Sequence, residues 1–316
     1  MPSVVQNLIS FVVPCYDEEE SIPLFYQEVI KIYEESLHQR GATMEFVFVD
    51  DGSRDGTLQL LKELHTQDDR VHFVAFSRNF GKEAAMYAGL EKTCGEYVVL
   101  MDADLQDPPA LLPQMYDAVT SEGYDCAAAK REDRKNEPPI RSFFASLFYR
   151  LINKLSSTKI EDGARDYRFM RRNVVEAVLS DREYNRFLKG IFSWVGFTTK
   201  WIKYHNVDRC AGETKWSFWK LLAYSIEGIL ACSTAPLAFV SIVGVALCVL
   251  AFVFLCFIVI RTLLFGDAVA GWPSMICVIV FLGGIQLFAI GIIGLYISKV
   301  YLETKQRPLF IIKEAE

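Results

Sequence analysis

Two long uncharged runs constrain the architecture of this chain more than any other feature of its sequence. No Asp, Glu, Lys or Arg occurs in residues 228–260, and none occurs in residues 268–298. Each run exceeds the ~20 apolar residues that a helix needs to cross a bilayer. We therefore predict transmembrane helices near residues 235–261 and 274–298. A buried helix hairpin in a soluble protein is the less favoured alternative.

The charges around these runs predict how the chain lies in a membrane. Basic residues stand at the outer ends of the pair: Lys215, Lys220, Lys299, Lys305 and Arg307. The connecting loop has one basic residue, Arg261, at its edge. Basic flanks stay on the cytoplasmic side, so we predict a multi-pass plasma-membrane protein with a cytoplasmic N-terminal part and C-terminus. The opening residues lack a signal-peptide pattern, and the eight cysteines form no CxxC pair that would indicate a zinc site.

The first 130 residues alternate between two periodicities. Apolar runs of strand length occupy residues 8–14, 44–50, 71–76, 96–101 and 124–129. Helical spacing occupies residues 21–38, 57–67, 81–93 and 110–121. Strands without polar alternation are buried on both faces, and alternation of such strands with helices is typical of a parallel sheet covered by helices on each side.

Polar clusters follow four of these predicted strands. They read PCYDEEES, DDGSRDGT, SRNFGKEAA and DADLQD. Ligands of such sheets bind beyond the carboxyl ends of the strands. Four polar clusters at four strand ends therefore indicate one binding site.

The fourth cluster begins with two carboxylates that are one residue apart. Asp102 and Asp104 can both face the cleft if the chain turns at the end of the strand. Carboxylate oxygens suit Mg²⁺ or Mn²⁺, cations that also bridge phosphates. The alternative is an acidic helix N-terminus, which accounts for Asp107 but not for Asp102 and Asp104. In the second cluster, Asp50, Gly52 and Asp55 are predicted to serve the turn, with Asp55 capping the next helix.

Five motifs in order resemble the motif series of family 2 glycosyltransferases. They are VVPCYDEEESI, VFVDDGSRDGT, SRNFGKEAAMYAGL, MDADLQDPP and RCAGETKWS, within about residues 8–220. The branch most resembled is the polyprenyl-phosphate glycosyltransferases, relatives of dolichol-phosphate mannose synthase, in their membrane-anchored bacterial form. The resemblance implies an α/β fold, in which a Rossmann-like GT-A nucleotide-sugar-binding domain with a mostly parallel sheet precedes two transmembrane helices.

The resemblance also implies roles for individual residues. Those implied for nucleotide-sugar binding are Pro14, Tyr16, Glu18, Val49, Asp51, Asp102, Ala103 and Gln106. Those implied for Mg²⁺ or Mn²⁺ are Asp102, Asp104 and Gln106, with Asp104 the most direct ligand. Those implied for phosphate are Arg131, Arg209 and Lys215. Asp104 and Asp166 are the implied catalytic residues, and Asp166 either acts in catalysis or orients the acceptor. An ion pair of Asp166 with Arg165 or Arg168 is the alternative.

The activity implied by the resemblance is an inverting transfer from a UDP-sugar, glucose or N-acetylglucosamine, to polyprenyl phosphate such as undecaprenyl phosphate. The product would be a lipid-linked sugar for cell-envelope glycosylation, made at the cytoplasmic membrane face. The lipid phosphate oxygen is already anionic, so positioning matters more than a strong base. The alternatives are a processive polysaccharide synthase and a non-catalytic membrane scaffold. No nucleic-acid partner is expected, and a homo-oligomer stays open.

These inferences predict four segments. Residues 1–215 form the cytoplasmic GT-A domain, with an interfacial amphipathic helix at about 140–156. A juxtamembrane amphipathic helix at 216–232, a two-helix membrane region at 233–299 and a cytoplasmic tail at 300–316 follow. The apolar face of the helix at 140–156 is also compatible with packing against a core.

Overall fold

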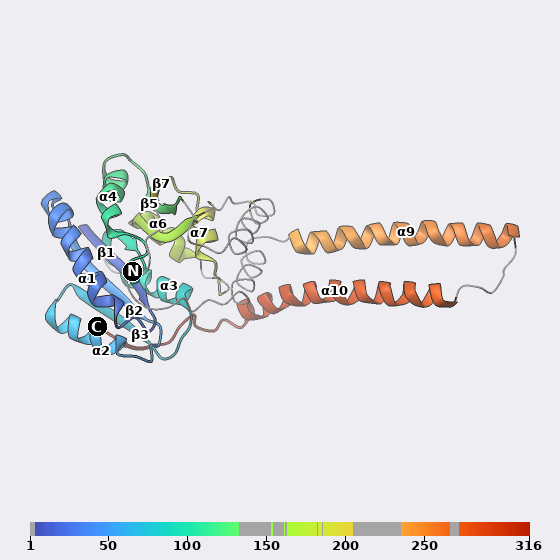
Figure 1. The fold of residues 1–316 in the computed structure, drawn as a ribbon, viewed down its shortest axis with the longest axis horizontal. Coiled ribbons are helices and arrows are strands. Elements are labelled where there is room, and N and C mark those ends of the chain that lie inside the picture. The colour runs from blue at the N-terminus through green and yellow to red at the C-terminus, as the bar shows by residue number, and fades with distance from the viewer. Residues whose placement is uncertain are drawn as a thin grey trace.

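The described part of the chain contains an eight-stranded sheet with helices on both faces, and a pair of long helices that extends away from it (Figure 1). The computed structural model describes residues 4–132, 153, 161, 163–181, 183–184, 186–204, 235–265 and 272–316. The strands are β1 (Val5–Cys15), β2 (Thr43–Asp50), β3 (Val71–Phe76), β4 (Gly95–Leu100), β5 (Cys126–Arg131), β6 (Ala164–Arg171), β7 (Thr199–Tyr204) and β8 (Ile312–Ala315). Their order across the sheet is β7-β5-β6-β4-β1-β2-β3-β8.

Helices connect most of the strands. In the sheet domain they are α1 (Ser21–Ile32), α2 (Thr57–Gln67), α3 (Lys82–Lys92), α4 (Leu112–Thr120), α6 (Arg172–Ser180) and α7 (Leu188–Trp194). A π-helical turn, Tyr33–Leu37, and a 3-10 turn, His38–Arg40, extend α1. A second 3-10 turn, Pro109–Leu111, precedes α4. All the strands and helices predicted within the first 130 residues are therefore confirmed, close to their predicted bounds.

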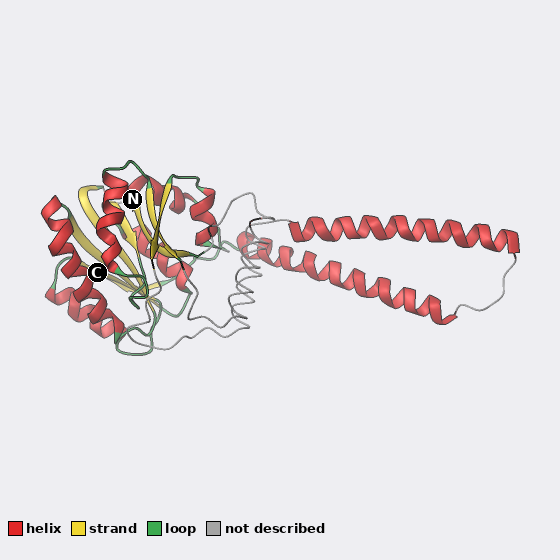
Figure 2. Ribbon diagram, turned by 45° about the horizontal axis from the view of Figure 1, so that its top comes forward, coloured by secondary structure: helices red, strands yellow, loops and turns green. Residues whose placement is uncertain are grey.

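The strands lack polar alternation because both faces of the sheet are buried. Along β1, Phe11 packs in the core that lies under α1, α2 and α4, whereas Val12 packs in the core under α3, α6 and α7. Both side chains are fully buried. Figure 2 shows the strands between the two layers of helices. β1 pairs in parallel with β2 and β4, and β2 pairs in parallel with β3, so the carboxyl ends of these four strands lie at one edge.

One inserted strand interrupts the parallel order. β6 lies between β4 and β5 and is antiparallel to both. Leu100 of β4 is paired with Arg168 of β6. Because the strands are antiparallel, two residues forward from Leu100 and two residues back from Arg168 lead to the same end of the pair, where Asp102 and Asp166 lie. The inserted strand therefore brings a second acidic residue to the end of β4.

The last residues of the chain form an edge strand of the sheet. The segment predicted as a cytoplasmic tail begins within the second long helix and ends in β8, which is antiparallel to β3. Phe73 and Glu316 exchange two backbone hydrogen bonds of 2.9 and 3.0 Å. Just before β8, the ring of Phe310 stacks on that of Phe76, with centroids 4.9 Å apart. β8 thereby covers the backbone groups that β3 would otherwise expose at the edge.

Replacement of Phe310 by Ala is expected to lower the stability of the sheet domain by about 1–3 kcal/mol, because a partly buried aromatic stack is lost. Thermal unfolding of the purified protein in detergent measures the loss. Ile311→Ala is the matched control, since Ile311 is 54% exposed and its backbone carbonyl still accepts from Ser77. Equal melting temperatures for the two variants would contradict the role of the stack.

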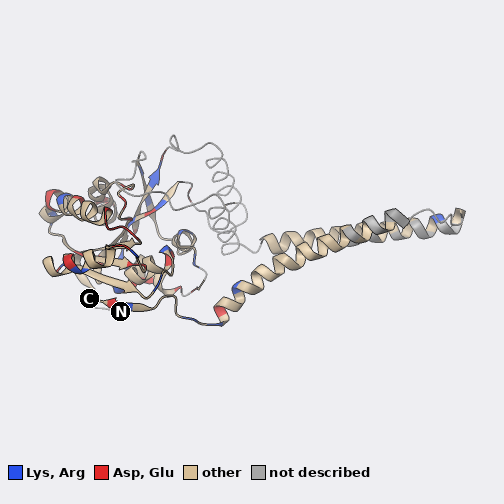
Figure 3. Ribbon diagram, turned by 60° about the horizontal axis from the view of Figure 1, so that its bottom comes forward, with Lys and Arg blue, Asp and Glu red and all other residues tan. Residues whose placement is uncertain are grey.

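The two long helices are α9 (Ala235–Phe265) and α10 (Trp272–Thr304), and they contain both predicted membrane spans. By length and composition, each contains a segment that could cross a bilayer: Pro236–Phe254 and Phe281–Thr304. Their charged residues lie near the ends (Figure 3). At the base of α10, the carboxylate of Glu303 accepts a hydrogen bond of 2.9 Å from the Tyr184 backbone N–H. The predicted amphipathic helices at 140–156 and 216–232 fall outside the described residues, apart from residue 153.

Candidate active site

The loops that follow β1 and β2 lie side by side and are joined by hydrogen bonds. Pro14 and Val49 are partners in the ladder between the two strands. One step further, the backbone N–H of Asp51 donates to the carbonyl of Cys15 at 2.9 Å. The backbone N–H of Glu18 donates to the Thr57 hydroxyl at 2.9 Å, and Glu18 itself accepts from the Ser21 hydroxyl at 2.7 Å. The structure therefore brings together, at the carboxyl ends of β1 and β2, five of the predicted residues: Pro14, Tyr16, Glu18, Val49 and Asp51.

The loop that follows β2 is also hydrogen-bonded to the loop that follows β3. The buried carboxylate of Asp51 accepts hydrogen bonds from the backbone N–H groups of Phe80 and Gly81, at 2.6 and 2.9 Å. Burial raises the pKa of Asp51 to about 6, although these two hydrogen bonds act in the opposite direction. Asp55 accepts from the N–H of Thr57, the first residue of α2, at 3.1 Å, but the N-cap of α2 is Gly56, so Asp55 lies one residue before the capping position predicted for it. A contact of Asp51 with a nucleotide base stays a prediction.

Gly52 lets these loops approach one another closely. Its φ of +68° is a conformation that side chains disfavour, and a Cβ atom there would lie 2.5 Å from the backbone carbonyl carbon of Arg78. Gly123 has a φ of +84°, but no atom would lie within 4 Å of its Cβ. Comparison of substitutions at Gly52 and Gly123 therefore separates two destabilising effects, that of an unfavourable backbone conformation and that of a steric clash with a neighbouring loop.

Gly52→Ala is expected to destabilise the protein by roughly 2–4 kcal/mol and to weaken nucleotide binding, because the loops after β2 and β3 must move apart. Gly123→Ala is the control and is expected to cost about 1 kcal/mol from backbone conformation alone. Thermal unfolding and UDP calorimetry measure the two effects. Similar losses in the two variants would show that the close approach at Gly52 is unimportant.

The segment after β4 makes the turn that the two-carboxylate hypothesis requires. Leu105 has a φ of +55°, a rare value for a residue with a side chain. The backbone N–H of Gln106 donates to Asp104 Oδ1 at 3.1 Å, and the Asp104 side chain is largely buried. Ala103 is buried between the two acidic residues. Such an unfavourable backbone at a polar strand end is typical of a functional site.

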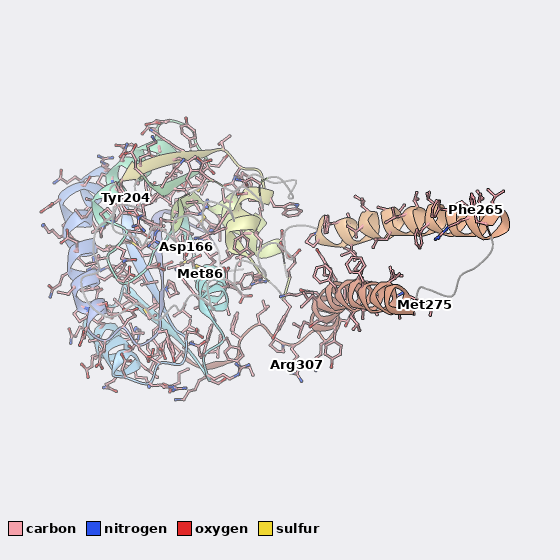
Figure 4. All side chains as sticks on the ribbon, turned by 45° about the vertical axis from the view of Figure 1, so that its right-hand side comes forward. Met86, Asp166, Tyr204, Phe265, Met275 and Arg307 are labelled. Carbon is pink, nitrogen blue, oxygen red and sulfur yellow. The ribbon has the colours of Figure 1, made fainter. Side chains whose placement is uncertain are left out.

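A lysine joins the ends of three elements at this point. Lys82, at the start of α3, donates from Nζ to Asp102 Oδ2 and to Asp166 Oδ2, both at 2.7 Å. Lys189 of α7 lies 3.8 Å from the other carboxylate oxygen of Asp166. Burial opposes the charged form of Asp166, but Lys189 and Lys82 outweigh it and hold the pKa of Asp166 well below its usual range. Asp166 therefore stays anionic at neutral pH. It lies within the sheet domain, far from the tip of the helical pair, where Phe265 and Met275 lie (Figure 4).

Two interpretations of acidic residues are wrong. Asp107 was predicted to favour a helix N-terminus, but its side chain is buried and accepts from Arg165 at 2.9 Å and from the Tyr204 hydroxyl. The alternative ion pair of Asp166 with Arg165 or Arg168 is also not formed. Arg165 pairs with Asp107 instead, and the Arg168 guanidinium lies over the Phe192 ring, 4.3 Å from its centroid.

The residues after β4 suit a hard divalent cation. The described residues contain no group of three His, Cys, Asp or Glu side chains arranged to hold a metal ion. Mg²⁺ and Mn²⁺ do not require one, since they are commonly held by one or two carboxylates together with substrate phosphates and water. Here the carboxylate of Asp102 already binds a positively charged group, the Lys82 ammonium. Asp104 provides a second carboxylate two residues further along the chain. The donor set of Asp102, Asp104 and Gln106 therefore fits such a cation.

The remaining predicted residues differ in what the structure says of them. Arg131 ends β5 and is partly buried. Arg209 and Lys215 lie outside the described residues, so their phosphate-binding role stays a prediction. Lys82 and Lys189 were not singled out from the sequence. Lys82 belongs to the polar cluster after the third strand, which was the available signal, whereas nothing in the sequence around Lys189 indicates a site.

Comparison with known proteins identifies the family. The model of glycosyl transferase family 2 matches residues 10–179. A protein of Escherichia coli (strain K12), named prophage bactoprenol glucosyl transferase homolog, is 41% identical over 98% of this chain and 99% of its own length. The bactoprenol glucosyl transferase of Shigella phage SfX is 42% identical over 96% of this chain and 98% of its own.

A solved structure, the glucosyl-3-phosphoglycerate synthase of Mycobacterium tuberculosis with Mn²⁺, UDP-glucose and phosphoglyceric acid, is 20% identical with a TM-score of 0.46, over 71% of this chain and 77% of its own. The family of this chain is shown by the family match and by the near full-length relatives, without this solved structure. The family resemblance in the motifs is confirmed, and so is the α/β GT-A fold with its mostly parallel sheet. The chain belongs to the family 2 glycosyltransferases.

Proposed function

We propose that this protein transfers glucose from UDP-glucose to a polyprenyl phosphate, with inversion at the anomeric carbon. The observation that carries this proposal is the similarity, over nearly the whole chain, to proteins named bactoprenol glucosyl transferases. The carboxylates after β4 support an enzyme rather than a non-catalytic scaffold. A buried Asp104 and a lysine shared by Asp102 and Asp166 would be costly features to keep in an inactive protein.

In the proposed reaction, Pro14, Val49 and Asp51 hold the nucleoside at the edge formed by β1 and β2. Asp102, Asp104 and Gln106 would hold Mg²⁺ or Mn²⁺, which would supply positive charge beside the diphosphate. An oxygen of the lipid phosphate forms a bond to the anomeric carbon, the bond from that carbon to the diphosphate breaks, and UDP departs with the electron pair. The attacking oxygen is already anionic, so no proton has to be removed from it.

Asp166 is proposed to orient the acceptor side of this reaction rather than to act as a base. Its depressed pKa makes its carboxylate a weak proton acceptor. Arg131, Arg209 and Lys215 are proposed to bind phosphate. Lys189 lies beside Asp166 and adds positive charge on the same side.

The helical pair is proposed to cross the plasma membrane twice and to leave the sheet domain in the cytoplasm. The basic residues at the outer ends of the pair support this orientation. The pairing of β8 with β3 supports the two crossings but not the choice of side, because it requires only that the sheet domain and the end of α10 lie on the same side of the membrane.

The test is incubation of the full chain in detergent with undecaprenyl phosphate, Mg²⁺ or Mn²⁺, and UDP-glucose, UDP-N-acetylglucosamine or GDP-mannose in turn. Mass spectrometry of the lipid is expected to show a hexose added from UDP-glucose. Absence of any glycosylated lipid with all donors would contradict the proposed activity. A product from UDP-N-acetylglucosamine alone would retain the reaction and correct the sugar.

A further inference from the structure

The Lys82 side chain bridges the two acidic groups that the proposed reaction uses on opposite sides. Asp102 belongs to the donor side and Asp166 to the acceptor side, and Lys82 Nζ lies 2.7 Å from an oxygen of each. The two partners are 20 and 84 residues away from Lys82 in the sequence. Three separate elements, α3, the end of β4 and the inserted strand β6, therefore meet at one ammonium group.

The position of this lysine is unfavourable for the helix that carries it. Lys82 is the first residue of α3, where the helix dipole favours negative charge. The next residue, Glu83, has the favoured sign, and its carboxylate accepts from the Leu188 N–H at 3.0 Å. A cation at the first position of α3 is thus accounted for by the two carboxylates and not by helix formation.

Neighbouring cations do not duplicate the bridge. Lys189 approaches Asp166 at 3.8 Å, and Arg165 pairs with Asp107. Among the described residues, only Lys82 lies within ion-pair distance of both Asp102 and Asp166. A compact ammonium can contact two carboxylates at once, whereas a planar guanidinium prefers one carboxylate held by two parallel hydrogen bonds.

We propose that Lys82 is a positioning residue of the transfer reaction, which holds Asp166 in register with Asp102 and competes with the divalent cation for the Asp102 carboxylate. The proposal rests on the proposed function for its first part and on the contact with Asp102 for its second. Without the ammonium, Asp102 at the end of β4 and Asp166 in the neighbouring strand β6 repel one another, and the acceptor side loses its alignment with the donor side. The same loss leaves Asp102 with more negative potential for a cation.

Lys82→Met tests both parts in the full chain. At saturating Mn²⁺, kcat is expected to fall roughly 10- to 100-fold while the KM for UDP-glucose changes less than about threefold, since alignment is lost and donor binding is kept. Mn²⁺ binding, measured without donor or acceptor by the electron paramagnetic resonance signal of free Mn²⁺, is expected to tighten about tenfold. Lys82→Arg is expected to recover part of the turnover, because it retains the charge but not the compact ammonium.

Lys92→Met is the matched control, because Lys92 is an exposed residue at the other end of the same helix. It is expected to match the parent protein in turnover and in Mn²⁺ affinity. Parent-like turnover in Lys82→Met, or Mn²⁺ affinity that does not rise, would overturn the inference. UDP calorimetry of Lys82→Met is the check that the variant is folded. If the parent protein itself transferred no glucose, the proposed function would fail, but the Mn²⁺ measurement would still decide the role of Lys82 at Asp102.

Discussion

Asp104→Asn is expected to reduce sugar transfer at least about a thousandfold while leaving the protein folded. The replacement keeps the size of a largely buried side chain, and its amide oxygen can still accept the hydrogen bond from the Gln106 N–H. It removes the negative charge that is proposed to hold the cation beside the leaving diphosphate. Initial rates with UDP-glucose and undecaprenyl phosphate measure the loss, and thermal unfolding in detergent checks the fold.

Two controls accompany this measurement. Asp117 lies on α4 and forms an exposed ion pair with Arg40. Asp117→Asn removes this carboxylate, and the variant is expected to transfer sugar at the parent rate. EDTA is expected to abolish transfer by the parent protein, and added Mg²⁺ or Mn²⁺ should restore it. Full activity in EDTA would remove the divalent cation from the mechanism.

Asp166→Asn is expected to lower kcat by about a hundredfold and to change UDP affinity by less than about threefold. The reason is the position of Asp166, which contacts Lys82 and lies near Lys189 on the proposed acceptor side. The amide cannot neutralise these ammonium groups or present a negative charge between them. Rates at varied polyprenyl phosphate concentration, together with calorimetry of UDP, separate the two effects.

The pH dependence of transfer distinguishes orientation from proton transfer by Asp166. The pKa of Asp166 lies below the ordinary value of 3.8, so its carboxylate is charged throughout the neutral range and loses its charge only on strong acidification. We therefore expect no change in kcat from this group above about pH 4. A fall in UDP affinity as large as the fall in kcat would instead assign Asp166 to the donor side.

β1 to β5 could be predicted because these strands are continuous apolar runs. β6 could not, because it contains Arg165, Asp166 and Arg168 within one strand. These charges are compatible with a sheet only through contacts from elsewhere in the fold, with Asp107, with Lys82 and with the aromatic ring of Phe192. Such partners are not visible in a local pattern.

Only the part of the site that is continuous in the sequence could be predicted. Asp102 and Asp104 are separated by one residue and follow a recognisable strand, so their spacing and context were sufficient to predict that they lie together at the end of that strand. The link to Asp166 depends on the antiparallel insertion of β6 beside β4, which no residue pattern indicates. Lys82 could be placed near a strand end, but its two partners became evident only from the structure.

The edge strand β8 also affects the order in which the molecule is completed. β3 is made early in synthesis, whereas β8 consists of Ile312–Ala315, which leave the ribosome after both long helices. Until then, the backbone groups of β3 have no partner on that side, and an unpaired strand edge is prone to pair with other chains. Closure of the sheet must therefore wait until α9 and α10 have been made, so a nascent chain that stops before β8 would keep an open, aggregation-prone edge.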